Sequence, residues 1–136
     1  MKKIVFTSDW HLGLYTSEIN RTSEIVQVCL NIVKHAIKIK ADLLVIGGDI
    51  FHSNNPNEFL ISQFIRILNL VRKYDLKTYV LVGNHDAISN GERKSCLDFV
   101  DLFKRSYPSV KLVSDIKCVE WFVADYGHVY LTFFPT

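Results

Sequence analysis

The stretch "DLLVIGGD" (residues 42–49) decides the fold class of this protein, because residues 43–48 are all apolar or glycine. A strand with one side in water alternates apolar and polar residues, and this stretch does not alternate. An unbroken apolar run is typical of a strand buried on both faces, as in parallel sheets covered by helices. We therefore predict a buried strand at 42–48, inside an α/β fold.

Strand-like and helix-like segments alternate around this run. The stretches "KIVFTS" (3–8) and "KTYVLV" (77–82) are rich in β-branched and apolar residues and predict two further strands. Between the strands, apolar residues recur at three- and four-residue steps, first over about 18–40 and then over a segment that Pro56 and Asn57 open. The order is β-α-β-α-β, and right-handed crossovers would make all three strands parallel.

The last third of the chain has a weaker pattern. We expect a helix around 95–105 and strands near 110–113, 118–123 and 128–134. There is no linker, repeat or low-complexity segment in the sequence, so residues 1–136 are interpreted as one domain.

Composition places the chain among globular proteins, with 136 residues, 49% of them hydrophobic and 22% charged. The net charge of +2 gives no argument for or against a nucleic-acid partner. Cys29, Cys96 and Cys118 have no CxxC spacing, which predicts free buried thiols in a reducing compartment. The N-terminal apolar run is too short for a signal peptide or a membrane span, so we expect a cytoplasmic protein without a membrane partner.

Polar side chains follow each of the first three predicted strands. They are Asp9 and His11 after the first strand, Asp49 and His52 after the second, and Asn84, His85 and Asp86 after the third. The carboxyl ends of the strands of an open parallel sheet line one crevice, which is the usual ligand site of α/β folds. We therefore expect all seven groups to converge there.

These groups are oxygen and nitrogen donors without a thiolate, which suit Mn²⁺, Mg²⁺, iron or zinc. Asp49 is short enough to bridge two ions, and Asn84 would be a neutral ligand. Two ions about 3.5–4 Å apart activate a water and hold the attacking and departing oxygens of a phosphoryl centre. In this interpretation His85 meets the substrate and Asp86 orients His85.

Three motifs carry a family resemblance. "TSDWHLG" (7–13), "GGDIFH" (47–52) and "GNHD" (83–86) resemble the motifs of the calcineurin-like metallophosphoesterases. More narrowly, they resemble the SbcD-type nuclease subunit of DNA double-strand-break repair, and the residues that favour this branch are Trp10, Leu12, Gly13 and Phe51. Trp10 itself fits either core packing or a DNA contact. The resemblance implies the N-terminal part of a metallophosphoesterase sandwich, with its metal site at the carboxyl ends of the strands.

The resemblance also implies roles for single residues. Asp9 and His11 would bind a first metal ion, Asp49 would bridge, and Asn84 would bind the second ion. His85 would protonate or stabilise the leaving oxygen, and His52 occupies a position near the substrate in some nucleases of this type. The implied cofactors are two divalent ions, with Mn²⁺ expected and Mg²⁺ as the alternative.

The sequence also departs from the family pattern. SbcD-type enzymes have further metal-binding histidines downstream, including a G-H-x-H motif, and the 136 residues do not supply them. In "YGHVY" (126–130), Tyr130 stands where the second histidine belongs, so we interpret His128 as a strand residue and not a ligand. The domain is therefore expected to be truncated before the downstream histidine motifs.

The resemblance favours a metal-dependent DNA nuclease that acts in double-strand-break repair or recombination. It implies DNA and an SbcC-type coiled-coil ATPase as partners, and a homodimer in the complete protein. Two alternatives stay open. One is an incomplete, non-catalytic half that binds nucleic acid or a partner chain, and the other is a phosphatase or small-molecule phosphodiesterase of the same superfamily.

Overall fold

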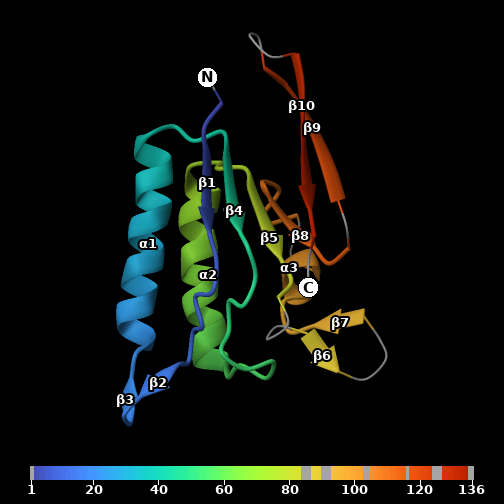
Figure 1. The fold of residues 1–136 in the computed structure, drawn as a ribbon. Coiled ribbons are helices and arrows are strands. Elements are labelled where there is room, and N and C mark those ends of the chain that lie inside the picture. Colours follow the sequence, from blue (N-terminus) through green and yellow to red (C-terminus); the bar gives the residue numbers. More distant parts are fainter. Residues whose placement is uncertain are drawn as a thin grey trace.

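The structure is a computed structural model, and it describes residues 2–83, 87–89, 93–102, 105–115, 117–123 and 127–134. A four-stranded sheet lies at its centre (Figure 1). Its strands, in spatial order, are β1 (Ile4–Thr7), β4 (Leu43–Ile46), β5 (Thr78–Leu81) and β8 (Val110–Val113), and all neighbours are parallel. The predicted β-α-β-α-β parallel arrangement is therefore confirmed, and the strand predicted near 110–113 extends the sheet.

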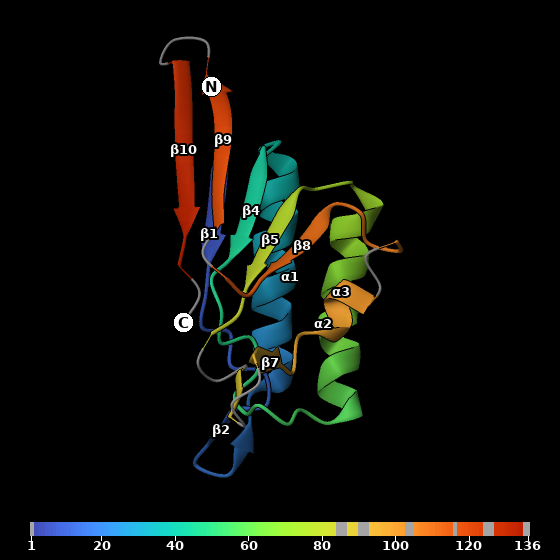
Figure 2. The same ribbon diagram turned by 90° about the vertical axis from the view of Figure 1, so that its right-hand side faces the viewer.

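Two amphipathic helices cover one face of the sheet (Figure 2). They are α1 (Thr22–Lys38) and α2 (Glu58–Lys73). Val33 of α1 and Phe64 of α2 are fully buried and pack in one cluster with Leu44 and Val80 of the sheet. Helix α2 begins where Asn57 caps it, because the Asn57 side chain accepts a hydrogen bond from the Leu60 backbone N–H at 2.9 Å.

A β-hairpin covers the other face of the sheet (Figure 2). It consists of β9 (Lys117–Val123) and β10 (Gly127–Phe133), which are antiparallel. Its side chains Leu131 and Phe133 pack on a second core cluster that includes Val45 and Tyr79, with the Tyr79 and Phe133 ring centroids 5.2 Å apart. The result is a layered arrangement of hairpin, sheet and helices, with the buried β4 and β5 in the middle.

Helix α1 begins at Thr22 and not near residue 18 as predicted. The short hairpin β2 (Tyr15–Thr16) and β3 (Ile19–Asn20) occupies the preceding residues. Ser17 and Glu18 at its turn have positive φ angles of 49° and 65°, which are incompatible with a right-handed helix.

The segment around 95–105, which was predicted as a helix, also differs from its prediction. It follows a second short hairpin, β6 (Ala87–Ser89) and β7 (Arg93–Ser95), and the helix in its described residues is the four-residue α3 (Phe99–Leu102). The Ser95 N–H donates to the Asp98 carboxylate at 3.1 Å, and the Leu97 N–H donates to the Ser95 hydroxyl at 3.0 Å. Such local side-chain bonds compete with helix formation, so the helix starts later.

No helix in the described ranges is both long enough and apolar enough to cross a bilayer. The three cysteines are free, as predicted, but only Cys29 is fully buried. Cys96 is partly buried and Cys118 is exposed, so the expectation of three buried thiols is wrong for these two. Cys118 lies in the covering hairpin, next to the half-buried Val119.

The buried Cys29 and the exposed Cys118 should differ strongly in reactivity. Burial raises the pKa of Cys29 from an ordinary value of 9.0 to about 12, because the thiolate would lose its hydration. At pH 8 we expect iodoacetamide to alkylate Cys118 at least roughly tenfold faster than Cys29, as followed by mass spectrometry. The raised pKa also stabilises the protonated folded state: this contribution is complete below about pH 9 and is lost as the pH rises toward 12. Equal alkylation rates in the folded protein would contradict this prediction.

Candidate metal centre

The loops that follow β1 and β4 stay paired beyond the ends of the strands. The Asp9 N–H donates to the Gly48 carbonyl at 3.1 Å, and the His11 N–H donates to the Asp49 carbonyl at 3.0 Å. The pairing ends at an isolated parallel bridge between Leu12 and Phe51. Backbone hydrogen bonds thus fix Asp9, His11 and Asp49 beside one another, at the edge of the sheet where the strands end.

Asp9, His11 and Asp49 all have left-handed backbone conformations, with φ angles of 55°, 49° and 49°. Residues other than glycine rarely adopt this region, and each such residue costs roughly 1–3 kcal/mol. Residues of this kind cluster at functional sites, where the surrounding structure imposes the conformation. Three of them in two paired loops indicate a site that the fold holds in place.

Glycines bring the end of β5 against the same loops. Gly48 has a φ of 104°, and a β-carbon there would lie 2.9 Å from the Gly83 Cα. A β-carbon on Gly83 would collide with the Asp49 carboxylate and backbone nitrogen. The loop after β5 therefore passes Asp49 at backbone contact, which only glycine permits. Sequence reasoning missed this role, although a glycine directly before a polar cluster could have indicated a close approach.

The side chains of the three residues converge. One possible ligand atom from each of Asp9, His11 and Asp49 lies within 4.8 Å of the other two, and this is the one group of its kind in the described part of the chain. The His11 Nε2 is 3.8 Å from the Asp9 Oδ1, and the Ser8 hydroxyl donates a hydrogen bond to the other Asp9 oxygen. Two carboxylates and an imidazole are a donor set that fits a divalent ion such as Mn²⁺, Mg²⁺ or Zn²⁺. Sequence reasoning also missed Ser8, which only its position next to Asp9 could have suggested.

His52 lies beside this group. Its backbone N–H donates to the Leu12 carbonyl at 2.9 Å, which places the residue at the end of the paired loops. Its Nδ1 is 3.4 Å from the Nδ1 of His11, and the two ring centroids are 5.4 Å apart. The His52 side chain is exposed, so it faces both the predicted ligand His11 and the solvent.

Trp10 anchors the first loop in the core. It is 6% exposed, its indole N–H donates to the Thr7 hydroxyl at 2.8 Å, and its ring packs edge-on against Phe64 with centroids 6.2 Å apart. Of the two interpretations of Trp10, the structure supports core packing. Phe51 also packs edge-on against Phe64, with ring centroids 5.8 Å apart, so one buried ring supports both loops.

The predicted groups Asn84, His85 and Asp86 lie outside the described residues. The chain enters that segment from Gly83, directly beside Asp49. His128 is the second residue of β10, and β10 begins at the end of the molecule where β1 begins, opposite the strand-end loops (Figure 1). The backbone path of β10 is therefore consistent with our interpretation of His128 as a strand residue.

Comparison with known proteins relates the chain to one family. The model of the family described as "Calcineurin-like phosphoesterase" matches residues 2–133. Among curated proteins, the chain is similar to the DNA double-strand break repair protein Mre11 of Methanosarcina acetivorans, with 28% identity over 115 residues, which are 83% of this chain and 19% of that protein. It is also similar to a subunit of the nuclease SbcCD of Escherichia coli K12, with 25% identity over 100 residues, which are 73% of this chain and 25% of that protein. The aligned region thus spans about a fifth to a quarter of these relatives.

Proposed function

This chain belongs to the calcineurin-like phosphoesterase family, and from that premise we propose that it provides the metal-binding part of a DNA nuclease of the double-strand-break repair type. The observation that supports the proposal is the convergence of Asp9, His11 and Asp49 donor atoms within 4.8 Å. The nuclease assignment within the family is supported by the similarity to Mre11 and to the SbcCD nuclease.

We assign the metal ligands as follows. Asp9 and His11 would hold one divalent ion, Asp49 would be shared with a second, and Asn84 would be a ligand of the second. The left-handed conformations and the backbone pairing support the assignment for Asp9, His11 and Asp49, because they hold these three donors in place before any ion arrives. When bound, such ions supply Lewis acidity toward phosphoryl oxygens and toward water. Mn²⁺ is the ion we propose.

The remaining polar groups would handle protons and the substrate. His85 donates a proton to the departing sugar oxygen, and Asp86 orients the imidazole of His85 by accepting a hydrogen bond from it. His52 meets the substrate at the solvent-facing side of the centre, a role that its exposure and its position beside His11 support.

We propose the binding partners of this protein from the names of its relatives. One relative is named as a DNA double-strand break repair protein and another as a nuclease subunit, so we propose DNA as the substrate and an SbcC-type coiled-coil ATPase as the partner. We also propose a homodimer in the complete protein. Residues 1–136 would form the part of the nuclease domain that precedes the downstream histidine motifs. The cytoplasmic location stays a prediction.

A substrate comparison tests the proposal. The natural full-length protein should cleave linear duplex DNA with Mn²⁺, should lose this activity in EDTA, and should hydrolyse p-nitrophenyl phosphate far more slowly. We expect EDTA to abolish DNA cleavage, because the proposed chemistry depends on the Lewis acidity of the bound ions. Fast hydrolysis of the phosphomonoester without DNA cleavage would support the phosphatase alternative instead. Tight binding of Mn²⁺ and DNA without cleavage would support the non-catalytic alternative.

A further inference from the structure

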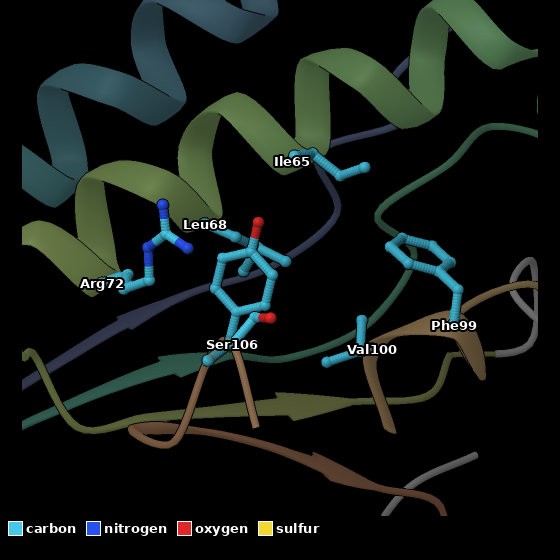
Figure 3. A pocket seen from close by; sticks show the side chains of 7 residues that line it. Ile65, Leu68, Arg72, Phe99, Val100 and Ser106 are labelled. Atoms are coloured by element: carbon cyan, nitrogen blue, oxygen red, sulfur yellow. The ribbon is translucent and has the colours of Figure 1, made fainter. Parts of the chain in front are cut away.

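A pocket separate from the metal centre lies between α2, α3 and the turn that precedes β8 (Figure 3). Its volume is about 200 Å³, and none of the predicted metal ligands lines it. Figure 3 shows Arg72 at one end of the pocket and Phe99 at the other, with Leu68 and Ser106 between them. Neither the family assignment nor the proposed nuclease chemistry uses this pocket.

The floor of the pocket is apolar and held in place by the core. Leu68 and Val100 line it and are almost fully buried. Phe99 packs edge-on against Phe64, with ring centroids 6.2 Å apart and an interplanar angle of 86°. Because Phe64 is itself fully buried, the Phe99 ring is supported from behind. The pocket is therefore a preformed apolar surface.

One end of the pocket carries a positive charge. Arg72 is exposed, and its guanidinium lies 5.2 Å from the centroid of the Tyr107 ring. The Tyr107 hydroxyl donates to the Asn69 side-chain oxygen at 2.9 Å, which fixes the ring beneath the guanidinium. Within the described ranges, Arg72 forms no ion pair with a carboxylate. Its charge is thus held at the pocket while its hydrogen-bond donors stay available.

We propose that this pocket binds a small organic anion, whose aromatic ring or short apolar chain fills the apolar part and whose carboxylate pairs with Arg72. The size fits, since a dry apolar cavity of about 150 Å³ already accepts benzene. The guanidinium fork matches a carboxylate with two parallel hydrogen bonds, and its position over Tyr107 leaves less freedom to lose on binding. Among the described residues that line the pocket there is no carboxylate, so these residues offer an organic cation no counter-charge.

A titration of the ¹⁵N-labelled chain with phenylacetate tests the proposal. We expect saturable amide shifts at Val100 and Ser106, and these shifts should be absent with acetate, which lacks the ring. Phenethylamine has the same ring with the opposite charge, and it should bind at least roughly tenfold more weakly, the scale of a hydrogen bond to a charged group. Equal affinities for the two compounds, or no saturable shift with phenylacetate, would overturn the proposal.

Three variants locate the site. Arg72→Gln should weaken phenylacetate binding roughly tenfold, whereas Arg66→Gln, which is also exposed on the same helix but lies outside the pocket, should not. Ser106→Trp should block the pocket, because Ser106 lines it and its exposed position tolerates a larger side chain. Unchanged binding by folded Ser106→Trp, or equal losses in the two arginine variants, would show that phenylacetate binds elsewhere.

Discussion

Replacing Asp49 with asparagine is expected to abolish Mn²⁺-dependent DNA cleavage by the full-length protein and to lower its Mn²⁺ affinity by at least roughly tenfold, because a neutral amide bridges two cations poorly. The fold should survive. Asparagine tolerates the left-handed conformation of Asp49 as well as aspartate does, and the bond from His11 goes to the backbone carbonyl of residue 49 and not to its side chain. A cleavage assay, calorimetric metal titration and a thermal unfolding curve measure the three quantities.

Asp75→Asn is the matched control for this substitution. Asp75 also has a φ of 49°, but it lies in the turn after α2, at the opposite end of β5 from the metal centre. The two variants therefore make the same chemical change in the same backbone conformation, and only Asp49→Asn should affect metal binding. Cleavage near the wild-type rate in Asp49→Asn would refute the bridging role.

Replacing His85 with alanine should separate proton transfer from binding. If His85 protonates the leaving oxygen, His85→Ala in the full-length protein should lower the cleavage rate by roughly a hundred-fold or more, the usual scale of general acid catalysis. The affinities for Mn²⁺ and DNA should stay within about twofold of the wild type, because the proton transfer from His85 would stabilise the transition state far more than the bound substrate. Single-turnover cleavage, metal titration and a DNA-binding assay measure these changes.

His35→Ala serves as the histidine control. His35 is an exposed residue in the last turn of α1, at the end of the molecule opposite the strand-end loops (Figure 1), and its removal should change none of the three quantities. A collapse of Mn²⁺ affinity in His85→Ala would mean that His85 is itself a ligand, and the division of roles with Asn84 would then be wrong.

The central fold could be predicted because its strands and helices have different hydrophobic periods. The run at 43–46 is buried on both faces, as its unbroken apolar pattern indicated. The two long helices follow the three- and four-residue spacing of their apolar residues. The short hairpins could not be predicted in this way, since two- and three-residue strands such as Tyr15–Thr16 are too short to show a period of two.

The position of the candidate site could also be predicted from the sequence. Parallel strands end at one edge, so their terminal polar groups were expected to meet, and the structure brings together Asp9, His11, Asp49 and His52. Their roles stay predictions, as do those of Asn84, His85 and Asp86, which lie outside the described residues. The close approach of Gly83 depends on the three-dimensional path of two loops, and the glycine before the polar cluster indicates only that a close approach is possible there.

The left-handed conformations of Asp9, His11 and Asp49 have a consequence for selection experiments. Glycine adopts these φ angles without the steric penalty that the present residues carry. A library selected only for heat resistance should therefore accumulate glycine at these positions. A library selected for both heat resistance and DNA cleavage should retain the original residues. The difference between the two populations would measure the cost in heat resistance of the original residue at each position.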